Sequence, residues 1–508
     1  MKRDPIDPHV ETSALDNGLR VVTVQLPHLH TCTLALYLRA GPRFERPAEN
    51  GLSHMVEHML FRGTARHRSA RALSSAIDSL GAVLDGATDR DLGVLHMSLP
   101  PERLGAGLEV LGEIVLRPRL ADLEAERALV LEEMSEDYDE DGVETNTEDL
   151  ACGAQFGGHP LGQRILGPRV NVERFTAADV RRHHARFYTA RNAVLCAAGP
   201  VAHAAVAAGA ARHFGGMRPG LEAEAEPAPP VSGGPRSRHS PSSGSLVSLT
   251  LTLRGITRRD PAAYAAFEAV LRVLDGGMSG RVYERLCIRD GLAYSVDAEI
   301  VDHVDATLLQ FTSEVAPANL GRVVGDTLGV LSALACGPVS AAELARVREG
   351  YRSSLLAQLD DAAAMAEWFG AAALFQEPLL PSARLALMSR VNARDVMLAA
   401  RHVAQPAGLA LAVVGPVSRA QLRALRRTGL HARRAESGRE RQVEERGQAI
   451  RNGQPGQCRH QPRVAPRAVA HDEVALGREA RDEGPVRRQQ VEPVARREAV
   501  EVDPGRRP

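Results

Sequence analysis

The chain has 508 residues, of which 44% are hydrophobic and 25% charged, and its formal net charge is −1. The length predicts two or more domains, and the balanced charge gives no reason to expect nucleic acid or a membrane surface as a partner of the whole chain. No run reaches the roughly 18–20 apolar residues of a membrane span, and the first residues lack the apolar core of a signal peptide. The six cysteines are scattered without a CxxC pair, so we expect no disulfide framework and a cytoplasmic protein.

Two predicted strands open the chain. Residues 19–25 and 31–38 alternate in polarity and are rich in β-branched side chains, which is typical of β-strands. A polar loop then leads to residues 51–63, GLSHMVEHMLFRG, whose apolar positions indicate a helix packed in the protein interior. The candidate chemistry of the chain is concentrated in this helix.

His54 and His58 are four residues apart, which places both imidazoles on one face of an α-helix. Two neutral imidazoles at this spacing can bind zinc, and the adjacent Glu57 can act as a base toward water at such a metal. Catalytic zinc sites use three protein ligands, and the carboxylate-rich helix predicted over 122–138 offers Glu133 as the third. The alternative is a surface pattern or a satisfied polar core.

The order His-x-x-Glu-His is the inverted form of a common zinc-protease motif. Together with the glutamate in the VLEEM stretch, it resembles the zinc peptidases of the pitrilysin, insulinase and mitochondrial processing peptidase family. The resemblance implies that His54, His58 and Glu133 bind Zn2+ and that Glu57 activates water. It also implies that Glu126, on the same face of the second helix, supports the metal site.

A second part of the resemblance concerns substrate binding. Residues 85–88 read DGAT where the family has Asn-Ala-x-Thr on a strand that holds extended peptide, which implies a substrate-binding role for Asp85. Aspartate keeps the acceptor and loses the amide donor, and a turn or strand edge without a substrate role is the alternative. His183 and His184, on a helix predicted to begin at Thr176, are interpreted as surface or core residues and not as ligands.

Residues 219–245 are rich in Pro, Gly and Ser and predict a linker between domains. Beyond it, residues 274–300 resemble the C-terminal-half motif of the family, with a glycine-rich turn, a helix, and GLAYSV in a strand. The resemblance implies that Tyr294 reaches the substrate near the metal. The family's arginine earlier in this motif is replaced by Cys287, a departure that affects substrate positioning, and simple packing is the alternative role for Tyr294.

The two halves resemble each other, because LALAVVGPV at 409–417 repeats the pattern of VLCAAGPV at 194–201. We expect an α+β fold of two homologous domains, each a mostly antiparallel sheet with helices on one side, closing as a clamshell. The predicted domains are the metal-binding domain 1–218, the linker 219–245, the second domain 246–428 without metal, and a disordered tail 429–508, which is polar and Arg-rich.

The sequence thus predicts a zinc-dependent endopeptidase that hydrolyses peptides or unfolded segments enclosed between its two domains. The alternative is a catalytically weak or inactive subunit that binds peptide or a partner in a processing-peptidase-like complex. The resemblance further implies a homodimer or a heterodimer with a related chain. A nucleic-acid binder acting through the Arg-rich tail is a third hypothesis, although we expect neither nucleic acid nor a membrane as partner.

Overall fold

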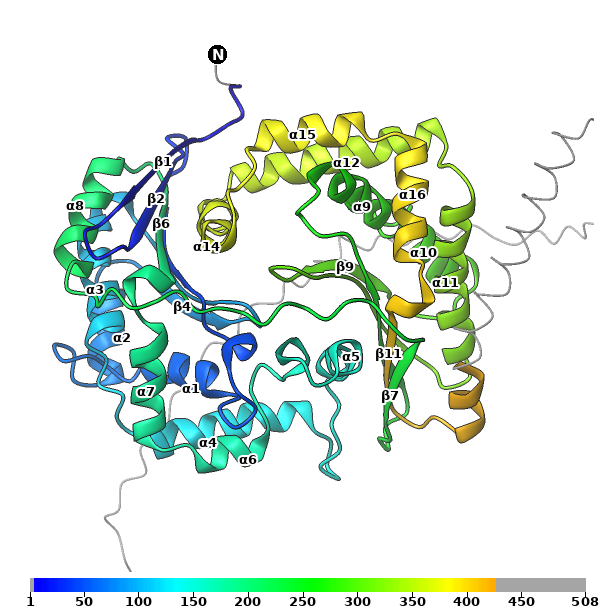
Figure 1. The fold of residues 1–508 in the computed structure, drawn as a ribbon, viewed down its shortest axis with the longest axis horizontal. Coiled ribbons are helices and arrows are strands. Elements are labelled where there is room, and N and C mark those ends of the chain that lie inside the picture. The colour runs from blue at the N-terminus through cyan, green and yellow to red at the C-terminus, as the bar shows by residue number, and fades with distance from the viewer. Residues whose placement is uncertain (1–3, 426–508) are drawn as a thin grey trace, which may run out of the picture. The chain divides into compact units, whose positions relative to one another are not determined.

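The structure is a computed structural model that describes residues 4–425, which lie within one compact unit (Figure 1). The predicted disordered tail, 429–508, lies outside the described residues. Within them, no single helix is long and apolar enough to cross a membrane. One bent pair of helices, α11 (Leu320–Cys336) and α12 (Ala341–Leu359), reaches the necessary length and apolar composition when the two are taken together.

The first half forms a six-stranded sheet with the order β1-β2-β6-β3-β5-β4. Every neighbouring pair is antiparallel except β2 and β6, which are parallel. Strand β4 therefore lies at one edge. The strands are β1 (His9–Ala14), β2 (Arg20–Gln25), β3 (Cys32–Leu38), β4 (Val83–Thr88), β5 (Gly93–Leu99) and β6 (Ala193–Gly199).

Helices of the first half cover one face of this sheet and enclose the main core. Their buried aliphatic and aromatic side chains, such as Met55, Leu111 and Phe187, pack with Leu34 and Leu36 of β3. These helices are α1 (Leu52–Leu60), α2 (Ala70–Asp78), α3 (Leu104–Leu116), α4 (Leu123–Glu133), α6 (Arg169–Arg174), α7 (Ala177–Phe187) and α8 (His203–Phe214). The other helix of this half, α5 (Thr147–Phe156), contributes no residue to this core.

The second half repeats this topology in a five-stranded sheet with the order β7-β11-β8-β10-β9. Its parallel pair is β7 with β11, and β9 lies at the edge that β4 occupies in the first sheet. The strands are β7 (Arg236–Ser240), β8 (Val247–Arg254), β9 (Asp297–Asp302), β10 (Thr307–Val315) and β11 (Leu409–Val414). The prediction of an α+β fold with two related domains is confirmed, and β7 lies inside the predicted linker.

A second helical layer packs on the second sheet around buried residues such as Phe267 and Phe311. It contains α9 (Pro261–Leu274), α10 (Arg281–Tyr283), the π-helical segment η6 (Glu284–Arg289), α11, α12, α15 (Pro381–Arg390) and α16 (Ala393–Val403). Helix α9 follows β8 as α1 follows β3, and α12 follows α11 as α4 follows α3. The chain order of the elements therefore corresponds between the halves.

Each half also supplies helix to the opposite face of the other sheet, so the expectation of helices on one side only was wrong. Helix α5 contacts β7, β8 and β11, and Leu150 packs against Val414. In return, α13 (Ala362–Ala366), η7 (Glu367–Ala371) and α14 (Ala372–Phe375) cover the first sheet, where Phe369 packs with Tyr37 and Cys196. Apolar residues on both faces of the central strands explain this exchange.

A buried ion-pair cluster also joins the halves. The Arg43 side chain is 1% exposed, and its guanidinium lies 2.9 Å from Asp91 and 2.5 Å from Asp305. Val304 donates its backbone N–H to the other oxygen of Asp91 at 2.9 Å. Asp91 belongs to the turn after β4 and Asp305 to the turn after β9, so Arg43 links the ends of the two edge strands.

Candidate active site

Helix α1 is anchored at its N-terminus by a carboxylate from the preceding loop. Glu45 accepts hydrogen bonds from the backbone N–H groups of Gly51 at 2.9 Å and Ser53 at 2.6 Å. These groups have no partner inside the helix, and a negative charge is favourable at this end of the helix dipole. Burial raises the pKa of Glu45, while these hydrogen bonds oppose the rise. His183 of α7 fixes the same turn through its Nε2, 3.0 Å from Ser53 Oγ.

The structure brings His54, His58 and Glu133 together. Nε2 of His54 lies 3.4 Å from one Glu133 oxygen, and Nε2 of His58 lies 3.2 Å from the other. One donor atom from each residue lies within 4.8 Å of the others. The His54 side chain is 8% exposed and that of Glu133 is 42% exposed, so the group is accessible on the side of the carboxylate.

These separations fit a metal ion. Ligand bonds of about 2.0–2.2 Å at tetrahedral angles place two donors of one zinc roughly 3.4 Å apart. The observed histidine-to-glutamate separations, 3.4 and 3.2 Å, agree with this value. Two imidazoles and one carboxylate are also a donor set of catalytic zinc sites. The residues present therefore fit zinc, and their role as ligands remains a prediction.

The charges in this group are strongly coupled. Burial lowers the pKa of His58, but the carboxylates of Glu126 and Glu133 outweigh burial and raise that pKa to about 9. Burial raises the pKa of Glu133, and the two imidazoles outweigh it and hold the pKa far below its usual range. The carboxylates of Glu126 and Glu133 thus favour a cation at this position, which is the electrostatic condition for metal binding.

Glu126 contacts the ring nitrogen of His58 that does not face Glu133. Its Oε2 lies 3.2 Å from Nδ1 of His58, and its Oε1 accepts a hydrogen bond from Arg62 in the turn after α1. With Nδ1 engaged, Nε2 of His58 is directed at Glu133. Carboxylates in this position orient the ring of a metal-binding histidine and make its other nitrogen more basic. The supporting position predicted for Glu126 agrees with this contact.

Glu57 lies between α1 and the edge strand β4. Its Oε2 accepts a hydrogen bond of 2.6 Å from Oγ1 of Thr88, the last residue of β4. Asp85 lies on the same strand and is exposed, and one of its oxygens accepts from the N–H of Gly86 at 2.9 Å. Asp85 is therefore on a strand edge and not in a turn, while its substrate-binding role stays a prediction.

Tyr294 is not part of the group. Its side chain is 96% exposed, and it lies in a bend before β9, which begins at Asp297. The prediction of a strand through GLAYSV was therefore wrong. Cys287, at the position of the family's arginine, belongs to η6 and is partly buried.

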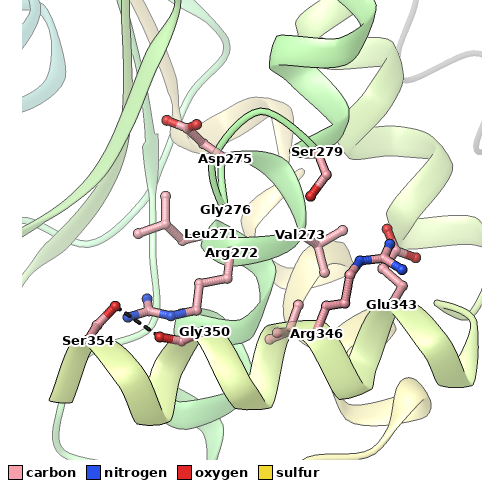
Figure 2. A pocket seen from close by; sticks show the side chains of 11 residues that line it. Leu271, Arg272, Val273, Asp275, Gly276, Ser279, Glu343, Arg346, Gly350 and Ser354 are labelled. Carbon is pink, nitrogen blue, oxygen red and sulfur yellow. Dashed lines mark hydrogen bonds between the residues drawn. The ribbon is translucent and has the colours of Figure 1, made fainter. Parts of the chain in front are cut away.

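The second half has a cavity of about 330 Å³ between α9 and α12, the helices that correspond to α1 and α4 (Figure 2). Arg272 of α9 extends along α12 toward Gly350 and Ser354, and Arg346 lies beside Glu343 (Figure 2). No histidine lines this cavity. That the second domain holds no metal stays a prediction.

Both halves match family models. The model described as "Insulinase (Peptidase family M16)" matches residues 20–169, and the one described as "Peptidase M16 inactive domain" matches residues 174–351. The chain belongs to the insulinase family of peptidases. The family was predicted from His54, Glu57, His58 and the VLEEM stretch, and that prediction is confirmed.

Relatives in this family align along most of the chain. An uncharacterised zinc protease of Mycobacterium bovis is 29% identical over 418 residues, covering 79% of this chain and 93% of that protein. The mitochondrial-processing peptidase subunit beta of Bos taurus is 28% identical over 429 residues, covering 81% and 85%. The crystal structure of a protease from Helicobacter pylori has the same fold, with a TM-score of 0.73 at 20% identity, and covers 81% of this chain and all of that one.

The sequence did not reveal four residues that position this insulinase-family site. Glu45 caps α1, His183 fixes the first turn, Arg62 holds Glu126, and Thr88 holds Glu57. A signal was present for two of them, because Arg62 follows the motif directly and Thr88 ends the DGAT stretch. Glu45 and His183 are recognisable only from the packing of distant segments.

Proposed function

We propose that this protein is a zinc-dependent endopeptidase. The observation that carries the proposal is the convergence of His54, His58 and Glu133, at separations of 3.2 and 3.4 Å, beside the carboxylate of Glu57. The zinc proteases among the relatives support the metal and the reaction class. We infer His54, His58 and Glu133 as ligands and Glu57 as the catalytic base.

Zinc held by these residues supplies Lewis acidity, which polarises a carbonyl and makes water easier to deprotonate. Glu57 takes a proton from the attacking water and later delivers it to the amide nitrogen of the leaving peptide. Glu126 and Arg62 keep His58 in the orientation that directs Nε2 toward the site. Glu45 fixes the N-terminal turn of α1, so His54, Glu57 and His58 are positioned by a rigid helix.

The substrate in this proposal is an extended peptide lying along β4. The outer edge of β4 pairs with no other strand among the described residues. Free backbone N–H and C=O groups at a sheet edge can pair with an added strand. Because Glu57 contacts β4 through Thr88, a peptide at this edge passes beside the catalytic base. Peptides and unfolded segments fit this geometry, because both can adopt an extended backbone.

The test compares zinc content and cleavage of an internally quenched peptide library among four proteins. We expect Glu57→Gln to retain zinc and to lose turnover, and Glu133→Gln to lose both. Glu132→Gln is the matched control, since Glu132 is the exposed neighbour on the same helix, and it should behave as the wild type. Turnover that survives in Glu57→Gln, or zinc that stays bound in Glu133→Gln, would contradict the proposal.

A second candidate is a subunit that binds peptide, or a related chain, without cutting. The exposed Tyr294 and the cysteine at position 287 favour it, because neither contributes a charged group to the site. One relative is a subunit by name, which supports pairing with a second copy or a related chain. Bound zinc without any turnover that depends on Glu57 would favour this candidate, and light scattering would measure the oligomeric state.

A further inference from the structure

Strand β4 presents alternate residues to helix α1. Its exposure alternates along the strand, with Leu84, Gly86 and Thr88 partly buried and the residues between them exposed. Side chains on a strand point to opposite faces in turn, so these three residues face the helix. Helix α1 packs against this strand. Two of them, Gly86 and Thr88, lie beside the Glu57 side chain.

Thr88 holds one oxygen of Glu57. Its hydroxyl donates to Oε2 at 2.6 Å, a short distance that is typical of a hydroxyl bonded to a carboxylate. A threonine has few rotamers because it is β-branched. Thr88 thus fixes the carboxylate from a side chain that itself has little freedom.

Gly86 leaves the space in which the other oxygen lies. A β-carbon at position 86 would lie 3.1 Å from both Cγ and Oε1 of Glu57, and 3.2 Å from Cε2 of Phe61. Such contacts are tighter than ordinary van der Waals packing, so the Glu57 side chain would have to shift. The position of the Glu57 carboxylate therefore depends on a hydroxyl at 88 and on the missing side chain at 86.

We propose that Thr88 is a positioning residue for Glu57, and that Gly86 provides the room that this position requires. The inference rests on the proposed function of Glu57 as base. With Oε2 engaged by Thr88, Oε1 is the oxygen left to take a proton from water. A base that is already held in the reactive orientation has little conformational freedom left to lose in the transition state. Releasing the Glu57 carboxylate from that orientation should therefore lower kcat.

The corresponding residues of the second half, Asp302 and Tyr264, form a similar contact between strand and helix. Thr88 ends β4 opposite Gly93 of β5, and Asp302 ends β9 opposite Thr307 of β10. Asp302 accepts a hydrogen bond of 2.5 Å from Tyr264 of α9. In both halves the last residue of the edge strand thus contacts a helix that precedes that strand in the chain, α1 in the first half and α9 in the second. In both halves a hydroxyl donates to a carboxylate at this contact, but the carboxylate lies on the helix in the first half and on the strand in the second.

The experiment compares Thr88→Val, which removes the donor at nearly constant shape, with Thr88→Ser, which keeps it. We expect Thr88→Val to lower kcat about tenfold, equivalent to ~1.4 kcal/mol, with KM and zinc content unchanged. Thr88→Ser should restore most of the activity. Gly86→Ala should lower kcat as well. Thr33→Val, which removes a hydroxyl on β3 that contacts Ser98, is the control and should leave kcat unchanged.

A wild-type kcat in Thr88→Val, or equal losses in the valine and serine variants, would overturn the inference in favour of simple packing. Crystal structures of the zinc-loaded wild type and Thr88→Val provide a readout independent of turnover. We expect a single Glu57 orientation in the wild type and a changed or multiple orientation in the variant. An unchanged orientation would overturn the inference, whereas a wild type without turnover would overturn only the proposed function.

Discussion

Replacing Glu126 by glutamine measures how much the support behind His58 contributes to metal binding. Glutamine keeps the length of the side chain and an acceptor oxygen for Nδ1, 3.2 Å away in the structure. It removes the negative charge that holds the imidazole and Arg62. Losing such a partner typically costs 10–100-fold in metal affinity. We therefore expect the Kd for zinc to rise about 10–100-fold, or ~1.4–2.7 kcal/mol.

The assay is competition for zinc against a chromophoric chelator at fixed pH and ionic strength, with urea unfolding to verify that the variant is folded. Glu124→Gln is the matched control, because Glu124 is on the same helix, its side chain is 83% exposed, and it pairs with Arg127. Its Kd should stay at the wild-type value. Equal zinc affinity in Glu126→Gln and the wild type would refute the reasoning, as would an equal loss in Glu124→Gln.

Three further predictions concern stability. Arg43→Met leaves Asp91 and Asp305 buried without their shared cation, so urea unfolding should show a loss of about 3–5 kcal/mol; an unchanged midpoint would contradict this. Burial lowers the pKa of His183 to about 3, so the unfolded chain takes up the proton first. Stability should therefore fall from pH 6.5 toward pH 3, by ~2 kcal/mol at pH 5, and His183→Asn should flatten that dependence. A β-carbon at Gly370 would lie 2.5 Å from Tyr37, so Gly370→Ala should cost ~1–3 kcal/mol, whereas Gly329→Ala, in open space on α11, should not destabilise the protein.

The metal helix was predictable because its evidence is local. His54 and His58 share a face through helical periodicity alone, and α1 forms over Leu52–Leu60 as that pattern indicates. Glu133 could be assigned only through the family resemblance, because periodicity does not specify how α4 packs on α1. Thr88 meets Glu57 because the sheet order places β4 beside α1. A contact of this kind depends on tertiary structure, which residue patterns along the chain do not reveal.

The wrong prediction around Tyr294 has a specific physical cause. The residues of GLAYSV have the composition of a strand, but side chains bind two of their backbone carbonyls. Asn319 donates to the carbonyl of Leu292 at 2.9 Å, and Ser313 donates to that of Ser295 at 2.6 Å. These carbonyls are thus satisfied without a neighbouring strand. Strand pairing with β10 begins only at Asp297, and Tyr294 remains exposed.

The predicted linker shows the opposite error, since a polar segment forms a strand. Residues Arg236–Ser240 read RSRHS, which has no apolar alternation, yet β7 pairs with β11 in parallel. Position explains the difference, because β7 lies at the edge of its sheet, where polar and charged side chains are favourable. Arg238 also reaches the first half through the carbonyl of Gly153, 3.3 Å away. Whether the domain boundary falls at 219–245 stays a prediction.

Among the described residues, the candidate metal-binding group lies in the first half only, although the two halves share a topology. In the second half, polar groups at the corresponding helices pair with each other. Tyr264 and Arg258 both bind Asp302, and Arg281 binds both oxygens of Glu343 on α12.

In the first half, the corresponding helices leave donor atoms directed at a common point, with both imidazole Nε2 atoms facing the half-exposed Glu133. Paired charges stabilise a fold without leaving ligand positions open, whereas nitrogen and oxygen atoms that converge on one point can share a cation. The two domains therefore share a scaffold and differ in whether its polar groups are satisfied internally. That difference supports the proposal that the chemistry belongs to α1 and α4.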